Sequence, residues 1–217
     1  NKKKKSIFIF SNPVIFVIYF FFIKFLFKRS KIFFFVHSHL TKKKYSLKLF
    51  NYISSFLFIF IDSVFYVSKF TKKWWQKEYY FCKYASSSIQ YNSIQIQKKF
   101  YKKLNKKFRI GFVGRLSDEK GLQKFIDIAY NYKDKFTFNI FSNEKLILKN
   151  SQKKFINFYF NKHSSLIYKN IDLLLVTSPI ENCPFNVLEA KAHGIPTLAY
   201  LTKGGISEII ENNFDGI

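Results

Sequence analysis

Residues 178–199 read SPIENCPFNVLEAKAHGIPTLA, and this stretch decides how the whole chain is interpreted. It carries two carboxylates, Glu181 and Glu189, on either side of a short turn that contains a proline. The apolar run Asp172–Thr177 leads into it and a second apolar run, Ile195–Leu201, leaves it. The order strand, acidic loop, acidic helix, strand places both acids at the carboxyl end of a parallel sheet, where open α/β sheets bind their ligands.

A second candidate site is the polar loop Gly114–Gly121, which follows an apolar strand and opens a helix. Gly114 permits unusual backbone angles and the close approach of a ligand. The free N–H groups at the helix start, together with Arg115 and Lys120, favour an anion, and a diphosphate is the natural occupant. The loop matches neither the Walker A pattern nor GxGxxG, so a basic turn with solvated side chains is the alternative.

Apolar runs alternate with segments of helical spacing along the chain. The predicted strands are Ser6–Phe10, Lys31–Val36, Asp62–Val67, Arg109–Val113, Phe136–Phe141, Phe155–Phe160, Asp172–Thr177 and Ile195–Tyr200. The predicted helices are Pro13–Arg29, Tyr45–Phe60, Ser68 through Trp75, Leu122–Tyr132, Ser164–Lys169, Val187–His193 and a helix that starts over Ile206–Glu211. This alternation is typical of α/β folds with parallel sheets packed between helices. We therefore expect two Rossmann-like domains facing a cleft, over residues 1–97 and 108–217, joined by a Lys-rich linker at 98–107.

Composition narrows the functional classes only partly. The 217 residues carry a formal net charge of +24 and include no Met. The excess of Lys over Arg fits codon bias in an AT-rich genome, yet the positive field would still attract a nucleotide diphosphate or anionic lipid headgroups. Cys82 and Cys183 lie far apart and outside any CxxC pair, which disfavours a disulfide framework or a zinc site and fits a reduced compartment. The aromatic residues fall mainly within apolar runs, which favours a core rather than a surface that stacks nucleic-acid bases.

The strongest candidate for a membrane segment is residues 14–27, an apolar run that contains Lys24 and is followed by Lys28 and Arg29. A spanning helix needs about 20 apolar residues, and this run is shorter. We therefore predict a buried helix of the α/β domain, with or without contact to a membrane interface.

Three motifs together resemble one enzyme family. They are Gly-Arg-Leu-x-x-Glu-Lys-Gly at 114–121, Glu-x7-Glu from Glu181 to Glu189, and Gly-Gly-x-x-Glu-Ile-Ile at 204–210. In this order they resemble the retaining GT-B glycosyltransferases of family 4, the glycosyl transferases group 1. The resemblance covers about Arg109–Ile217. It implies two GT-B domains, both incomplete in this chain, with the Gly-rich loop of the first domain expected to precede Asn1.

The resemblance also implies roles for individual residues. Arg115 and Lys120 would hold the diphosphate of the donor, Glu181 would contact the donor sugar, and Glu189 would accept hydrogen bonds from the ribose. The other groups implied at the donor are the loop at Gly114 and the backbone N–H groups of Phe185 and Asn186. Without the resemblance, two glutamates near a helix start are more commonly capping and surface features.

The N-terminal part resembles the family less closely. His37, at the end of a predicted strand, is similar to the histidine that faces the donor sugar across the cleft in these enzymes. Tyr91-Asn92-Ser93-Ile94 is similar to their Tyr-Asn-Gly-Ile, with Ser93 in place of Gly. A structural histidine at a strand end is the alternative for His37, and a metal pair with His39 lacks a third ligand. His163 and His193 are interpreted as structural residues associated with helices.

The function implied is transfer of a sugar, with retention, from a nucleoside diphosphate sugar to an acceptor hydroxyl, without a metal. A glycan or lipid-linked acceptor in cell-surface polysaccharide or glycolipid synthesis would place the enzyme in the cytoplasm, peripherally at the inner face of an anionic membrane. Two alternatives stay open: a catalytically inactive fragment, and a basic protein that binds nucleic acid or membrane. The expected partners do not include nucleic acid.

Overall fold

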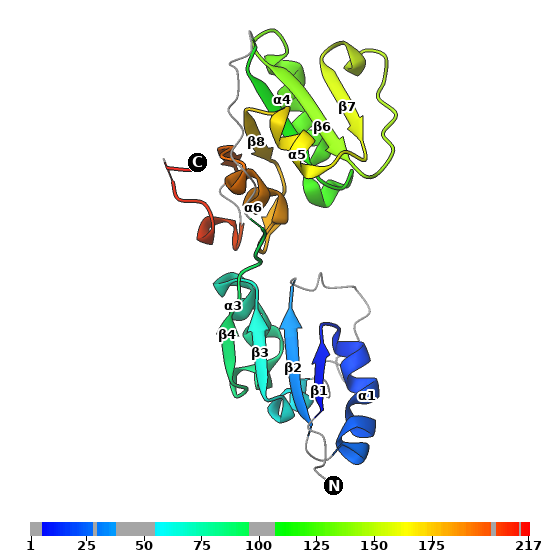
Figure 1. Cartoon of the computed structure of the whole chain (residues 1–217), viewed down its shortest axis with the longest axis vertical. Helices are drawn as coiled ribbons and strands as arrows, with labels where there is room; N and C mark the ends of the chain where they lie inside the picture. Colours follow the sequence, from blue (N-terminus) through cyan, green and yellow to red (C-terminus); the bar gives the residue numbers. More distant parts are fainter. Residues whose placement is uncertain (1–5, 28–29, 38–54, 96–106, 201–202, 213) are drawn as a thin grey trace. The chain divides into compact units, whose positions relative to one another are not determined.

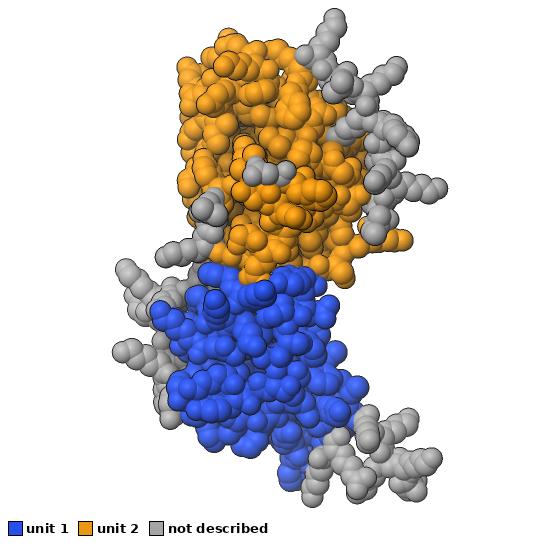
Figure 2. Space-filling view, turned by 90° about the vertical axis from the view of Figure 1, so that its left-hand side faces the viewer, with its two compact units in different colours: residues 1–91 blue, residues 92–217 orange. Residues whose placement is uncertain are grey.

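The chain forms two compact units, each with its own parallel sheet (Figures 1 and 2). The computed structural model describes residues 6–27, 30–37, 55–95, 107–200, 203–212 and 214–217. Unit 1 spans residues 1–91 and unit 2 spans residues 92–217. The parallel sheets confirm the predicted α/β class. Within the expected linker, residues 98–106 lie outside the described part of the chain.

The sheet of unit 1 has the order β1-β2-β3-β4, and every neighbouring pair is parallel. Its strands are β1 (Ile7–Phe10), β2 (Lys31–Val36), β3 (Ser63–Tyr66) and β4 (Ser87–Ile89). Alternate residues of β2 point into an aromatic core, in which the Phe34 ring lies 4.9 Å from Phe58 and 5.8 Å from Trp75 between centroids. The buried phenylalanines of this core are Phe10, Phe16, Phe20, Phe34 and Phe58.

Two helices of unit 1 begin with capping side chains. Asn12 caps α1 (Pro13–Leu26) by accepting hydrogen bonds from the N–H groups of Val14 and Ile15. Ser68 caps α3 (Lys69–Glu78) by accepting from the Thr71 N–H. The predicted helix Tyr45–Phe60 lies mostly outside the described residues, and its described end is helical over 55–57 and continues as the 3-10 turn η1 (Phe58–Phe60). A second 3-10 turn, η2 (Tyr80–Lys83), follows α3.

The prediction that the apolar run 14–27 forms a buried helix is only half right. The helix α1 forms, but it buries one stripe, Pro13, Phe16, Phe20 and Ile23, against the sheet. Its other face is exposed, because among the described residues it packs against a single layer. Within the described residues, no helix is both long enough and apolar enough to cross a bilayer.

The sheet of unit 2 has the order β10-β8-β5-β6-β7, again parallel throughout. Its strands are β5 (Arg109–Val113), β6 (Thr137–Ser142), β7 (Ile156–Phe160), β8 (Leu173–Val176) and β10 (Thr197–Ala199). The helix α4 (Leu122–Tyr132) packs through Phe125 on one face of the sheet. The helices α5 (Ser164–Lys169) and α6 (Phe185–Ala192) contribute to a second core on the other face. Side chains of β6 alternate between these cores, as a strand buried on both faces requires.

Short elements complete unit 2 where the sequence predicts loops. The strands β9 (Ile180–Glu181) and β11 (Lys203–Gly204) form a two-stranded parallel sheet. The 3-10 turns are η3 (Asp118–Lys120), η4 (Gln152–Lys154) and η5 (Ile206–Glu208). The predicted helix over Ile206–Glu211 is wrong, since only η5 forms there. The Glu211 N–H donates to the Asp215 carboxylate at 2.9 Å instead of continuing a helical pattern.

Candidate functional site

The loop after β5 is held in place by backbone contacts. Gly114 has a φ of +155°, which disfavours any side chain, and its N–H donates to the Phe141 carbonyl at 3.1 Å. The Leu116 N–H donates to the Glu144 carboxylate at 2.6 Å. Glu144 follows β6 and was not singled out by the sequence, yet it fixes the middle of the loop. The loop is therefore preorganised by the neighbouring strand β6 and the residues that follow it.

A contact with the end of β8 fixes the last residue of this loop. Gly121 has a φ of +69° and precedes α4 without any side chain capping the helix. The Thr177 hydroxyl lies 3.1 Å from the Lys120 carbonyl and 2.9 Å from the Gly121 carbonyl. A Cβ on Gly121 would overlap the backbone oxygen of Thr177. Glycine is therefore required here both by the backbone angle and by the close approach of β8.

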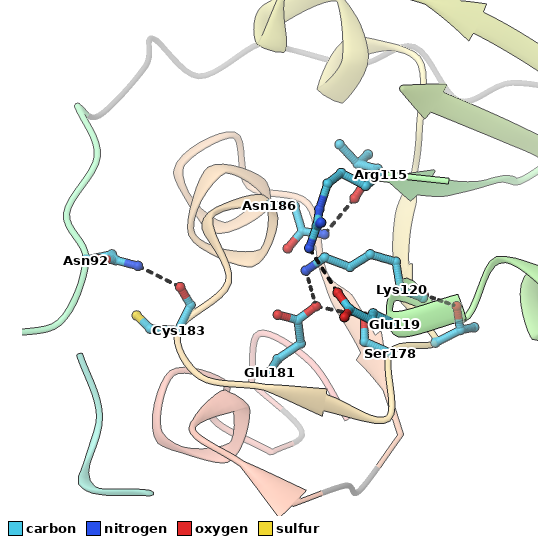
Figure 3. A network of polar contacts seen from close by, with 10 residues as sticks. Asn92, Arg115, Glu119, Lys120, Ser178, Glu181, Cys183 and Asn186 are labelled. Carbon is cyan, nitrogen blue, oxygen red and sulfur yellow. Dashed lines mark hydrogen bonds and ion pairs between the residues drawn. The ribbon is translucent and has the colours of Figure 1, made fainter. Parts of the chain in front are cut away.

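Lys120 and Glu181 form an ion pair at the centre of the site (Figure 3). The Lys120 Nζ lies 2.5 Å from the Glu181 Oε1, and the Ser178 hydroxyl donates to the same oxygen at 2.7 Å. The Glu181 residue is only 7% exposed, and burial of a carboxylate is tolerated because both partners are present. Both bonds use Oε1, and within the described part of the chain no such bond is made to Oε2.

Arg115 carries the second positive charge of the loop. Its guanidinium lies 3.2 Å from Glu119 in an ion pair whose side chains are both more than 60% exposed. An exposed pair of this kind contributes little to stability, so Arg115 can exchange Glu119 for an anionic ligand at small cost. Figure 3 shows Arg115, Lys120 and Asn186 pointing toward the region of Glu181. The structure therefore brings the two predicted cations and the first predicted acid together.

The start of α6 provides unused polar groups beside these charges. The helix begins at Phe185, two residues before the predicted start, and no side chain caps it. Asn186 donates from Nδ2 to the Val113 carbonyl at 2.8 Å, which ties α6 to the end of β5. Its Oδ1 is buried and has no hydrogen-bond partner within the described residues. An uncapped helix start with an unused side-chain oxygen offers both donors and an acceptor to a polar ligand.

Glu189 is oriented by a tyrosine that the sequence did not single out. The Tyr168 hydroxyl donates to the Glu189 Oε2 at 2.9 Å and lies 3.0 Å from the Asn186 carbonyl. Burial, and then the charge of Glu189, raise the Tyr168 pKa above its usual range, so the hydroxyl keeps its proton as a donor. The Tyr168 ring stacks on His193 at 4.8 Å, and His193 contacts the Glu189 carbonyl. In the sequence, Tyr168 is one residue of an apolar helical pattern, and only its hydroxyl group distinguishes it from an ordinary core residue.

The third sequence motif also meets Glu181. Gly205 donates its N–H to the Glu181 carbonyl at 2.7 Å, and Gly204 lies opposite Glu181 in the β9–β11 pair. The Asn92 side chain donates to the Cys183 carbonyl at 2.7 Å, as Figure 3 also shows. Cys183 and Cys82 are buried free thiols. Segments far apart in the sequence thus converge on the turn between Glu181 and α6.

The described histidines lie at the ends of strands and helices. His37 belongs to unit 1, follows β2, is exposed, and stacks on Phe35 with centroids 6.3 Å apart. Its proposed role at the donor sugar stays a prediction, and His39 lies outside the described residues. His163 caps α5 and His193 ends α6, as structural residues do. Among the described residues, no three His, Cys, Asp or Glu side chains gather as metal ligands.

This arrangement agrees with a match between unit 2 and a known family. Residues 93–217, more than half of the chain, match the family described as glycosyl transferases group 1. The chain belongs to this family. Its fold is the GT-B fold of these enzymes, as the motif resemblance predicted. No curated protein matches the chain.

Several solved structures share the fold over almost all of this chain. HepE of Anabaena, in complex with UDP, aligns with a TM-score of 0.75 at 18% identity over 98% of this chain and 64% of its own. TarM of S. aureus aligns with 0.71 at 15% identity over 97% and 44%. A glycosyltransferase of Rickettsia africae aligns with 0.70 at 16% identity over 98% and 62%. The chain therefore spans between 44% and 64% of the length of these structures.

Proposed function

We propose that unit 2 binds a nucleoside diphosphate sugar and that the chain takes part in transferring the sugar, with retention, to an acceptor hydroxyl. The observation that carries this proposal is the Lys120–Glu181 ion pair, at 2.5 Å, where three motif-bearing segments meet. A buried carboxylate beside an uncapped helix start and two cations fits a ligand that combines sugar hydroxyls with a diphosphate. The UDP and UDP-glucose complexes of HepE support a uridine nucleotide as the first donor to test.

The chemical demand on such a site is to stabilise the departing diphosphate. Arg115 and Lys120 supply fixed positive charge, and the starts of α4 and α6 supply N–H groups, all in place before the bond breaks. Glu181 would receive a hydroxyl of the donor sugar on Oε2, and Glu189 would receive a ribose hydroxyl on Oε1. We propose no side-chain base for the acceptor. In this scheme the leaving phosphate takes the acceptor proton, and no metal is required.

The acceptor and the cellular site form the finer part of the proposal. We propose a glycan or lipid-linked acceptor in cell-surface polysaccharide or glycolipid synthesis, at the inner face of the cytoplasmic membrane. The complex of TarM with α-GlcNAc-glycerol and UDP supports an acceptor of this chemistry. An inactive fragment that retains only donor binding is the second candidate, because the chain covers only part of the solved structures that it matches.

Nucleotide binding separates these candidates most directly. The wild-type protein should bind UDP or another nucleoside diphosphate in calorimetry, and a donor panel should show which nucleotide sugar it hydrolyses or transfers. Lys120→Met should weaken binding and transfer by about 100-fold or more, since removal of one charge-stabilising donor costs about this factor. Lys124→Met, at an exposed lysine of the following helix α4, should leave both unchanged.

Each outcome has a distinct meaning. Binding without turnover of any donor would favour the inactive fragment. No binding of any nucleoside diphosphate, or full activity of Lys120→Met, would reject the proposed site. Glu181→Gln keeps the shape and the Ser178 contact, so it separates a lost charge from a lost fold. Tight binding to oligonucleotides that falls steeply with salt would instead favour the nucleic-acid alternative.

A further inference from the structure

Glu144 is an exposed acidic residue that contacts the cationic loop Gly114–Gly121 but has no part in the proposed chemistry. It lies two residues after β6, at the carboxyl end of the sheet. Its Oε2 accepts a hydrogen bond from the Leu116 N–H at 2.6 Å, in the middle of the loop. An acid at this position calls for an explanation, because its charge has the same sign as that of a diphosphate.

The contact from Glu144 lies where the loop has little other support. The two ends of the loop are held by neighbouring strands. The Gly114 N–H donates to the Phe141 carbonyl at 3.1 Å, and the Thr177 hydroxyl lies 2.9 Å from the Gly121 carbonyl. From 115 to 119, within the described part of the chain, the bond to Glu144 is the one hydrogen bond to a residue outside the loop. Glu144 therefore supports the part of the loop that carries Arg115.

The bond acts on the backbone next to Arg115. The Leu116 N–H belongs to the peptide group that joins these two residues. A peptide group is planar, so a fixed N–H fixes the plane and with it the torsion that follows the Arg115 Cα. Leu116 also packs a half-buried side chain against the core of unit 2. The Arg115 side chain itself is exposed and pairs with the exposed Glu119 at 3.2 Å. Its direction thus depends on how the backbone is held.

Glu144 is suited to this task because it is anchored itself. Its own N–H donates to the Ser142 Oγ at 3.1 Å. Ser142 ends β6, is 7% exposed, and accepts at its carbonyl the N–H of Asn161 at 2.8 Å. A backbone N–H is a fixed donor, so the bond orders only one flexible side chain. A charged acceptor also makes the bond stronger than a neutral one would be.

We propose that Glu144 is a positioning residue of the nucleotide site. Its carboxylate holds the peptide group between Arg115 and Leu116, so that the guanidinium meets the diphosphate in a preorganised direction. This inference rests on the proposed function, because the diphosphate is the ligand proposed there. Glu144 acts through the loop rather than on the ligand. Its negative charge opposes anion binding only weakly, since solvent screens an exposed carboxylate.

Two substitutions at Glu144 separate the hydrogen bond from the charge. Glu144→Gln removes the charge and keeps an oxygen that can accept from the Leu116 N–H, whereas Glu144→Ala removes both. In the protein without nucleotide, the Leu116 amide proton should exchange about tenfold faster in Glu144→Ala than in the wild type, as NMR can measure. In calorimetry, the same variant should bind UDP about tenfold more weakly.

The conservative variant and a control complete the experiment. Glu144→Gln should stay within about threefold of the wild type in both measurements, because a neutral hydrogen bond replaces a charged one. Asp134→Ala removes the same charge at an exposed site after α4 and should change neither. Rescue by glutamine identifies the acceptor oxygen as the group that matters, which a general effect of surface charge would not produce.

The exchange measurement distinguishes this inference from the proposed function. If the wild-type protein binds no nucleoside diphosphate, the proposed function fails, while the exchange rates still decide whether Glu144 holds the loop. If the wild-type protein binds UDP, an unchanged affinity or an unchanged Leu116 exchange rate in Glu144→Ala would overturn the positioning role alone. Equal losses in Glu144→Gln and Glu144→Ala would also overturn it. Tighter binding of UDP by both variants would overturn it in favour of a carboxylate that repels the ligand.

Discussion

The two units begin their helices differently, although both place them after parallel strands. In unit 1, Asn12 and Ser68 cap α1 and α3 with their side chains. In unit 2, α4 begins after Gly121 and α6 after Pro184, and neither helix has a side-chain cap. Among the described α-helices of unit 2, the short α5 is the one that carries a side-chain cap, from His163. The uncapped starts are those beside Lys120 and Glu181.

This difference separates structural helix starts from starts that can receive a ligand. A capping oxygen satisfies the first N–H groups of a helix and closes the position to anions. An uncapped start sacrifices some stability and leaves those donors, and the positive end of the helix dipole, to a bound anion. The position of the caps thus supports the anion site that we propose in unit 2.

The largest expected effect is at the uncapped start of α4. Gly121 and Gly194 both have a φ of +69°, but a Cβ at Gly121 would overlap the carbonyl of Thr177, directly after β8, whereas nothing lies within 4 Å of a Cβ at Gly194. Gly194→Ala should lower the free energy of unfolding by about 1 kcal/mol, the cost of the left-handed backbone alone. Gly121→Ala should cost about 3 kcal/mol or more, since β8 must also shift.

Hydrogen exchange of the β5 and β8 peptides measures these losses within unit 2. Gly121→Ala should also abolish nucleotide binding, while Gly194→Ala should bind normally. Equal losses of stability in the two variants would show that the contact between Gly121 and Thr177 does not constrain the loop.

Much of the fold of both units, and the place of the candidate site, could be predicted from the sequence. The alternation of apolar runs and helical spacing predicts both parallel sheets, and Gly114, Gly121 and the two glutamates mark where the chain turns at the sheet edge. The pairing of Lys120 with Glu181 could not be predicted without the fold, because 60 residues separate them. Their approach depends on the β8–β5 pairing, a long-range register that local patterns do not contain.

The missed features have physical reasons as well. The two residues of β9 are too few to show a period, and they form a strand only because β11 returns beside them. The sequence pattern reflects only the burial of the Tyr168 ring. It does not show that the hydroxyl contacts Glu189. The exposed face of α1 was missed because hydropathy alone does not tell which apolar side chains meet a second layer.

The next largest effect concerns Glu189, the second glutamate of the Glu-x7-Glu motif. Tyr168→Phe removes the hydroxyl that holds Glu189 at 2.9 Å and leaves the ring stacked on His193. If Glu189 receives the ribose, the preference for UDP over 2′-deoxy-UDP should shrink about tenfold, as expected for a lost hydrogen bond to a charged group. Calorimetry with both nucleotides measures this preference. Tyr159→Phe is the matched control, and an equal loss of affinity for both nucleotides would leave Tyr168 with a purely structural role.

A smaller effect tests the capped starts of unit 1. Asn12→Ala should lower the free energy of unfolding of unit 1 by about 1 kcal/mol, because two N–H groups lose their acceptor. Both tryptophans, Trp74 and Trp75, belong to α3, so tryptophan fluorescence during urea unfolding reports on unit 1 alone. Nucleotide binding should not change. Asn131→Ala, an exposed residue of α4, is the control, and a changed nucleotide affinity in Asn12→Ala would contradict the division between the units.

The last effect is confined to alkaline pH and concerns the core of unit 1. Burial raises the pKa of the Cys82 thiol above its usual range, and it raises the pKa of Tyr79 to about 12. The folded state therefore holds these protons more tightly than the unfolded state. The resulting stabilisation is complete below the unfolded pKa and is lost as the pH rises toward the folded pKa. Unit 1 should become less stable above about pH 8.5, the ordinary thiol pKa.

Cys82→Ala removes one of these titrating groups. The decline in the free energy of unfolding with pH should therefore become shallower by about 1.4 kcal/mol per pH unit. Urea unfolding between pH 8.5 and 11, followed by tryptophan fluorescence, measures the slope. Cys183→Ala provides the comparison, because burial also raises the pKa of that thiol, but in unit 2. It should leave the fluorescence-detected slope unchanged. An equal change of slope in both variants would mean that the two units unfold together, so that their stabilities, unlike their helix starts, are not independent.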